Sequence, residues 1–183
     1  ALALVFELSL QGALVLEDGK FTQGGEPPAD EVLRLAAEGA AGATPTSAVR
    51  RLADDDPLTA MLARLVARGV LHDAEVWSPG VHLPKEPHRE AAVRERLHEA
   101  LVAGGEPSEH DTALIALLHH LGIVTRVLHS SEKKELATRA EEIATQSRPL
   151  QDYEGRRATA KSRRWWDATD VLDVVVHALN IFN

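Results

Sequence analysis

Residues 108–122 read SEHDTALIALLHHLG and predict a helix that lies at the centre of the protein. Ser108 is suited to cap the start of this helix, because Asp111 follows three residues later, as the partner does in a capping box. The apolar residues that follow are dense enough for burial on most sides of the helix. Gly122 is placed to end it, since glycine readily adopts the backbone conformation found just past a helix.

The segments on both sides of this helix also have helical patterns, so the protein is expected to consist mainly of helices. Before it, residues 90–103 place apolar side chains on one face. After it, residues 132–146 predict an exposed, charge-laced helix, and residues 167–182 predict a last amphipathic helix. Further helices are expected at residues 3–11, 30–38, 46–52 and 57–68.

Local start signals support the helices in the first third of the chain. Asp30 and Asp56 are residues of the type preferred at a helix N-cap, and Pro57 suits the first helical position. For the helix that lies between these two aspartates, Thr46 or Ser47 is the expected cap.

Short strands are expected in two places. Residues 13–16 and 20–22 flank a tight turn at 17–20, and residues 75–77 and 81–83 flank Ser78-Pro79-Gly80. The predicted fold class is therefore mainly α: a compact multi-helix bundle with one or two short β-hairpins. A length of 183 residues is ordinary for one domain, so residues 1–183 are expected to form a single domain.

The chain carries a formal net charge of −8 at pH 7 and contains no cysteine. A net-acidic protein is not coated for nucleic acid or for whole-body attraction to anionic lipid, so any anion binding is expected to be local. The lack of cysteine excludes disulfide scaffolds and thiolate metal sites. No apolar run reaches the roughly 18 residues that span a membrane. We expect a soluble, cytoplasmic protein, and the excess of arginine over lysine with abundant alanine indicates a GC-rich, bacterial genome.

Nine histidines raise the question of a metal site, but their spacing does not support one. His119 and His120 are adjacent and point to different faces of the central helix, whereas a zinc helix places two histidines four residues apart. The sequence contains no nucleophile-elbow, phosphate-loop or dinucleotide-binding motif. We predict no enzymatic activity, no metal site and no cofactor.

Three pieces of sequence, in order, resemble the Golgi phosphoprotein 3 family. Residues 7–14 read ELSLQGAL, which is similar to the family's E-L-x-L-x-G-x-L. Residues 65–71 read LVARGVL, which is similar to L-V-x-[KR]-G-V-L at the helix end that leads into a hairpin. Residues 114–118 read LIALL, at the place where the family has a central helix. The order and spacing of these pieces carry the resemblance over nearly the whole chain.

The resemblance implies a compact helical bundle with a protruding hairpin and no chemistry of its own. It also implies a peripheral membrane protein that binds phosphatidylinositol 4-phosphate. In eukaryotic members the headgroup site uses a tryptophan and an arginine before the first core helix, and two arginines near the start of the helix before the hairpin. The first pair would fall at or before Ala1, and the second aligns with Asp55 and Leu58, neither of which is basic.

Other cations near the same helix are therefore the candidates for a phosphoinositide headgroup. Arg50 and Arg51 precede the helix, and Arg64 and Arg68 lie one turn apart on it. Arginine suits this role because its planar guanidinium can hold two phosphate oxygens at once. The alternative is a solvated helix face, with Arg68 near a helix C-terminus, where cations are favoured.

Two further segments suit a membrane surface. Trp77 and Val81 flank the tip of the second expected hairpin and are the residues there that fit a bilayer interface; the alternative is that Trp77 packs on the body. Basic residues at 156–164 stand beside Trp165-Trp166, a combination that suits lipid headgroups or single-stranded nucleic acid. The alternative is an exposed segment whose tryptophans fold back onto the core.

Two other functions remain open on the sequence. One is a protein-interaction scaffold without lipid binding. The other is a winged-helix DNA-binding regulator, because residues 62–83 place a helix before a hairpin. Residues 72–83 contain no lysine or arginine to hold DNA phosphates, which argues against that function and against a nucleic-acid partner. The expected partners are an anionic phospholipid headgroup and a membrane surface, and a homo-oligomer is left open.

Overall fold

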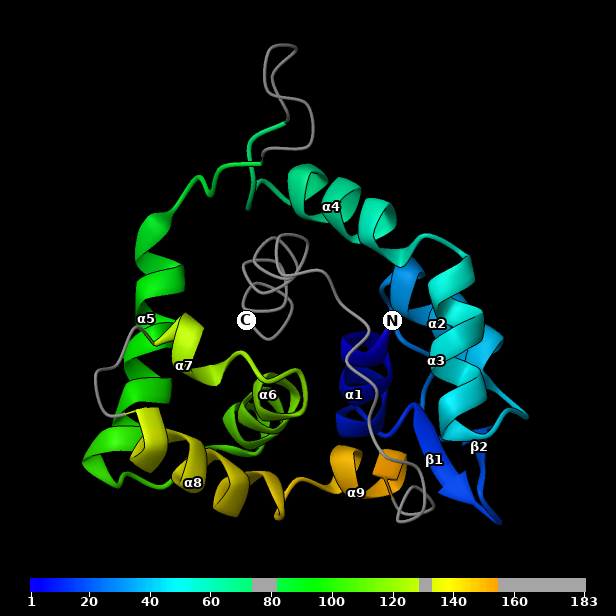
Figure 1. Cartoon of the computed structure of the whole chain (residues 1–183). Coiled ribbons are helices and arrows are strands. Elements are labelled where there is room, and N and C mark those ends of the chain that lie inside the picture. The colour runs from blue at the N-terminus through cyan, green and yellow to red at the C-terminus, as the bar shows by residue number, and fades with distance from the viewer. Residues whose placement is uncertain (74–81, 129–132, 155–183) are drawn as a thin grey trace.

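The computed structural model describes residues 1–73, 82–128 and 133–154 (Figure 1). In this part of the chain 65% of the residues are helical. The strands within it form one two-stranded antiparallel sheet. The predicted mainly α class is therefore confirmed.

The chain order is simple, with a helix before a hairpin and then a succession of helices. The elements are α1 (Leu2–Leu10), β1 (Leu14–Glu17), β2 (Lys20–Gln23), α2 (Glu31–Ala40), α3 (Pro45–Asp54), α4 (Pro57–Ala67), α5 (Pro87–His98), a π-helical turn at Glu99–Ala103, α6 (Glu109–His120), α7 (Val124–Val127), α8 (Lys133–Ala144) and α9 (Arg148–Glu154). Figure 1 shows α1 and α6 near the middle of the molecule, with α2, α3, α5 and α8 toward its edges.

The helix α6 is central, as its apolar sequence predicts. Every residue from Ala113 to Leu118 is buried, and α6 packs against α1, α5, α7, α8 and α9. Ser108 is the N-cap: its Oγ accepts a hydrogen bond from the Asp111 N–H at 3.1 Å and donates one to Asp111 Oδ2 at 2.8 Å. The predicted start of this helix is therefore confirmed.

The first helix, α1, contributes to both halves of the core. Leu4, Val5 and Leu8 pack with side chains of the sheet, α2 and α3. Phe6, on another side of α1, packs with side chains of α5 through α9. Because the helix is covered on most sides, the Glu7 carboxylate is also buried, and its Oε1 accepts a hydrogen bond from Gln11 Nε2 at 2.6 Å.

The sheet is the predicted first hairpin. Glu17 faces Lys20 across the turn, where Asp18 and Gly19 have φ angles of 48° and 75°. Positive φ at both central residues is what a two-residue hairpin turn needs, and Asp-Gly is a favoured pair for it. The turn residues thus explain why these short strands pair in this register.

Helix caps in the first third of the chain agree with expectation at two places and differ at one. Asp30 Oδ1 accepts from the N–H groups of Val32 and Leu33 at 3.1 and 3.2 Å, and Asp56 caps α4. The prediction of Thr46 or Ser47 as the cap of α3 is wrong, because Thr44 caps it and Pro45 opens it. Proline has no N–H to leave unsatisfied at the first helical position and has a fixed helical φ, so the helix begins there.

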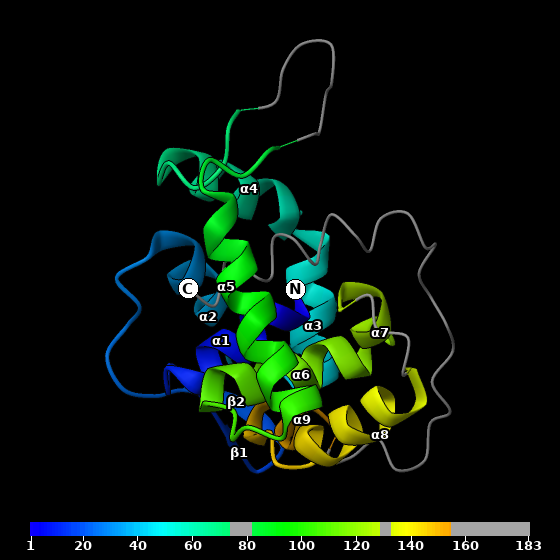
Figure 2. The same cartoon turned by 90° about the vertical axis from the view of Figure 1, so that its left-hand side faces the viewer.

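One end of the molecule is formed by the residues that follow α4 and precede α5. Leu71 and Pro84 form an antiparallel bridge, the His72 N–H donates to Leu83 O at 2.8 Å, and the Lys85 N–H donates to Val70 O at 2.9 Å. Figures 1 and 2 both show these residues at the same end as α4, with α8 and α9 at the other end. Residues 70–72 and 83–85 therefore lie side by side.

Several expected elements lie outside the described residues. They are most of the second hairpin with Trp77 and Val81, the basic stretch 156–164 with Trp165-Trp166, and the last amphipathic helix at 167–182. Within the described part, α5 begins at Pro87 rather than at residue 90, since proline again opens the helix.

Candidate functional site

Two arginines that are far apart in the sequence line one surface hollow between the end of α4 and the start of α5. The hollow measures about 100 Å³ and is lined by Arg68, Gly69, Val70, Pro84, Glu86 and Arg89. We call it the α4–α5 hollow. The backbone pairing of Val70 with Lys85 explains its position, because that pairing fixes the last turn of α4 beside the first turn of α5.

The Arg68 guanidinium is the uncommitted cation of the hollow. Arg68 is the C-cap residue of α4 and is exposed. Within the described part of the chain its side chain makes no ion pair or hydrogen bond. A solvated guanidinium with no partner can bind an incoming anion without first breaking a protein contact.

The second guanidinium, that of Arg89, is already paired within the hollow. Arg89 Nε bonds Glu86 Oε2, and His88 Nε2 lies 3.7 Å from the same oxygen. The Glu86 and Arg89 side chains are 47% and 49% exposed. Lys85 is also exposed at this point in the chain. Two arginines and one carboxylate therefore line the hollow, and Lys85 directly precedes Glu86 in the chain.

An exposed apolar side chain, that of Leu83, lies close to these charged residues. Leu83 is 63% exposed, which is the highest value among the exposed large apolar side chains of the described residues. It lies directly opposite His72 in the backbone pairing, one residue before Pro84 of the hollow. Apolar side chains beside cations are typical of surfaces that meet lipid headgroups.

The four arginines predicted to form a headgroup site do not come together. Arg64 turns away from solvent and pairs with Asp30, the N-cap residue of α2, and its side chain is 12% exposed. The same guanidinium is 4.0 Å from Met61 Sδ through Nη1. Arg64 thus links α4 to α2, while Arg68, one turn later, lines the hollow.

Arg50 and Arg51 are exposed on α3 and do not line the α4–α5 hollow. Asp55 is the C-cap residue of α3, and Leu58, in the first turn of α4, is 40% exposed. These two positions, which align with basic residues of the eukaryotic site, are thus an acidic and an apolar surface residue here.

The sequence does not identify two cationic residues at this end of the molecule, Lys85 and Arg89, as candidates for an anion site. Their distance in sequence from Arg68 hides them, and only the chain reversal between α4 and α5 brings them near. The signal that could have found them is the second expected hairpin itself, because two antiparallel strands return the chain to the place from which it left.

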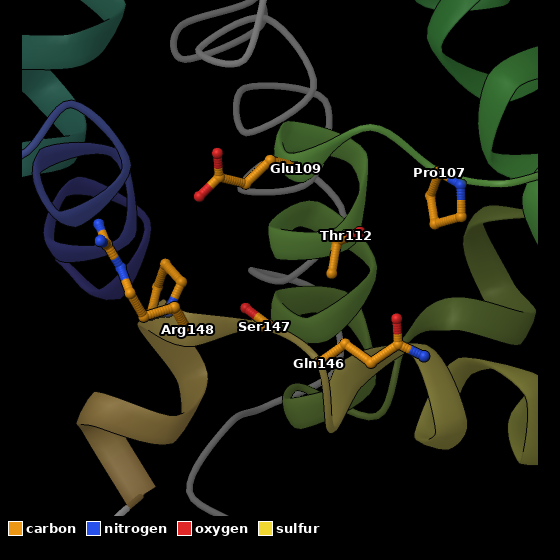
Figure 3. Close-up of a pocket in the computed structure, with 7 residues that line it drawn as sticks. Pro107, Glu109, Thr112, Gln146, Ser147 and Arg148 are labelled. Atoms are coloured by element: carbon orange, nitrogen blue, oxygen red, sulfur yellow. The ribbon is translucent and has the colours of Figure 1, made fainter.

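A larger hollow of about 180 Å³ lies between α6 and the junction of α8 and α9. Its lining residues are Pro107, Glu109, Thr112, Gln146, Ser147, Arg148 and Pro149. Figure 3 shows Arg148 reaching toward α1 and Gln146 pointing the other way. Arg148 Nη2 donates to Ser9 O, so its guanidinium is already used to join α9 to α1. With Glu109 as the other charged lining residue, this hollow suits an anion less well than the α4–α5 hollow, despite its size.

Two further findings on the described residues bear on other functions. Among residues 1–73, 82–128 and 133–154, no group of three histidine, cysteine or carboxylate side chains is placed to hold a metal ion. In the same part of the chain, no helix has the length and apolar character needed to cross a bilayer.

Comparison with known families identifies the family of the protein. The family model described as Golgi phosphoprotein 3 (GPP34) matches residues 1–173, which is nearly the whole chain. The protein belongs to the Golgi phosphoprotein 3 family. No curated protein and no solved structure matches the chain.

The structure locates the pieces of sequence that resemble the Golgi phosphoprotein 3 family. The first begins within α1, the helix that both halves of the core share. The second, residues 65–71, spans the end of α4 and the bridge residue Leu71, and it includes Arg68. The third lies wholly in the buried part of α6. The Golgi phosphoprotein 3 family is not a known family of enzymes.

Proposed function

We propose that the protein is a non-enzymatic, peripheral membrane protein that binds phosphoinositide headgroups of the phosphatidylinositol 4-phosphate type. The observation that carries this proposal is the convergence of Arg68 and Arg89 on one hollow, beside the backbone pairing of residues 70–72 with residues 83–85. Membership of the Golgi phosphoprotein 3 family supports it at the level of a lipid-related role.

The chemistry of the hollow suits a phosphate. A guanidinium presents paired N–H donors that match two phosphate oxygens, so two guanidiniums can hold one phosphate group from different sides. Arg68 enters from the end of α4 and Arg89 from the first turn of α5. The start of α5 adds the positive end of a helix dipole, which also favours an anion. Of the four arginines expected from the sequence, Arg68 is thus the one on which we base the site.

The position of the hollow suits a bilayer surface. Exposed Leu83 lies beside the cations, and Trp77 and Val81 precede it closely in the sequence. With this end of the molecule directed at the membrane, these apolar residues enter the interfacial layer and Arg68, Lys85 and Arg89 face the headgroups. Contact is peripheral, because a few such residues bury far less apolar area than a spanning helix.

Vesicle co-sedimentation tests the proposal. The full chain is mixed with vesicles of a neutral lipid that contain or lack phosphatidylinositol 4-phosphate, at about 0.15 M salt, where surface charges act over only about 8 Å. Wild-type protein is expected to sediment with the phosphoinositide vesicles. Arg68→Glu and Arg89→Glu should each reduce the bound fraction about tenfold or more, since each loses a charge-assisted bond and adds a repulsion.

A matched control separates the site from net charge. Arg139→Glu reverses a similarly exposed arginine on α8, at the other end of the molecule (Figure 2), and is expected to bind as wild type does. Arg50→Glu and Arg51→Glu are expected to weaken binding less than Arg68→Glu, because these residues do not line the hollow. If wild-type protein sediments with no anionic vesicle, lipid binding is ruled out and the protein-interaction scaffold takes its place.

A further inference from the structure

The α4–α5 hollow contains its own anion, the carboxylate of Glu86. This carboxylate bonds Arg89, the same guanidinium that we assign to the headgroup, and both residues line the hollow. A headgroup phosphate that binds Arg89 through Nε must therefore replace Glu86 there. The inference below rests on the phosphate binding of the proposed function.

The Glu86–Arg89 pair is weak enough to be exchanged. Both side chains are about half exposed, and they are three residues apart across the start of α5. Ion pairs of this kind are held in water and contribute little, because the charges are well solvated and the side chains lose freedom on pairing. Glu86 has no capping role that its exchange would disturb, since its side chain makes no cap hydrogen bond to α5.

Because Glu86 competes with the ligand for Arg89, it favours one kind of phosphate over another. The phosphate of a diester lipid carries one negative charge, as Glu86 does, so replacing Glu86 on Arg89 yields little electrostatic gain. A phosphate monoester carries a charge of about −1.5 to −2 at neutral pH and three terminal oxygens. It can hold Arg89 more strongly than Glu86 does and still reach Arg68. Internal competition of this kind raises specificity by penalising the wrong ligand.

We propose that Glu86 is a specificity-determining residue that makes the α4–α5 hollow selective for phosphate monoesters over phosphate diesters. In a lipid the monoester is a terminal phosphate on the headgroup, and in solution it is a small phosphorylated molecule. Glu86 disfavours diester lipids by occupying Arg89 Nε, and a ligand of higher charge displaces it more readily.

The experiment compares wild-type protein with Glu86→Gln on vesicles of two compositions and on a soluble probe. One vesicle carries phosphatidic acid, a monoester, and the other carries phosphatidylglycerol, a diester, at equal total charge. Wild-type protein should prefer the monoester vesicle about tenfold, from the stronger charge-assisted bonds. Glu86→Gln should bind the diester vesicle several-fold better than wild type, and so lose most of that preference.

Glu142→Gln is the matched control. Glu142 pairs with Arg139 at the same three-residue spacing and with similar exposure, but on α8 at the other end of the molecule. It should keep the wild-type preference. An equal gain of Glu86→Gln on both vesicles would mean that Glu86 acts only through net charge and would overturn the inference. So would a wild-type protein that binds both vesicles equally, which would leave membrane binding itself intact.

The soluble probe, glycerol 3-phosphate, separates the two sources of the monoester. Wild-type binding to this probe without binding to any vesicle would keep phosphate-monoester binding by the hollow and overturn the membrane function. Binding to neither the probe nor the vesicles would overturn both.

Discussion

Asp152 on α9 is a side chain whose ionisation opposes folding. Burial raises the pKa of Asp152 above its ordinary value of 3.8, and the neighbouring Arg148 guanidinium offsets this only in part. The folded protein therefore binds this proton more tightly than the unfolded chain does. The stabilising contribution is fully present below pH 3.8 and is lost as the pH rises through the folded-state pKa.

Replacing Asp152 with asparagine removes this loss of stability with rising pH. Because asparagine cannot ionise, Asp152→Asn is expected to raise the free energy of unfolding at pH 7 by no more than about 0.5 kcal/mol, the side chain being partly solvated. The difference should shrink toward about pH 4, where wild-type Asp152 is increasingly protonated. Urea unfolding at both pH values measures it, with Glu106→Gln, at an exposed loop position, as the control. A variant less stable than wild type at pH 7 would contradict the assignment.

Asp30 joins two elements, and its two roles can be separated. Its Oδ1 caps α2, and its Oδ2 pairs with Arg64 of α4. Asp30→Asn keeps a capping oxygen but loses the charge, whereas Asp30→Ala loses both. We expect Asp30→Ala to lower the free energy of unfolding by about 2 kcal/mol and Asp30→Asn by about half of that. A lost cap costs about 1 kcal/mol, and an ion pair that is partly solvated contributes up to about 1 kcal/mol.

Denaturant titration of these two variants and of Arg64→Ala measures the free-energy contributions of the cap and of the ion pair. Arg64→Ala and Asp30→Asn should not be additive in combination, because each removes the same pair. Equal losses for Asp30→Asn and Asp30→Ala would show that the cap contributes nothing. Full additivity would show that α4 is held to α2 by Met61 and other apolar contacts alone.

At the scale of elements, the sequence predicts what local chemistry controls. The sequence predicts the caps at Asp30, Asp56 and Ser108 and the Asp18-Gly19 turn, because each acts on residues only two or three positions away. The helices α7 and α9 were not expected, since four and seven residues are too few to show a periodic pattern. They form because side chains such as Val127, Leu150 and Tyr153 pack into the core around α6.

At the scale of the whole molecule, the candidate site could be predicted only in part. Arg68 was identified from its place on the helix before the expected hairpin. Two features of the site depend on how α2, α4 and α5 are arranged in space. Arg64 pairs with Asp30 instead of lining the hollow, and Arg89 lines the hollow together with Arg68. Spacing along one helix indicates on which face of the helix a side chain lies. The residue that neutralises its charge comes from elsewhere in the chain.

The net charge of −8 sets a last prediction at this scale, because a net-acidic body must approach an anionic surface with its cationic end first. In about 0.01 M salt charges act over about 30 Å, so carboxylates remote from the hollow also repel the membrane. Combined Glu141→Gln and Glu142→Gln changes on α8 should therefore increase vesicle binding at about 0.01 M salt. At about 0.15 M salt, where the range falls to about 8 Å, the same variant should bind as wild type does. Co-sedimentation at the two salt concentrations measures this. A gain that persists at the higher salt would place α8 against the bilayer, and would contradict an approach through the end that carries Arg68 and Arg89.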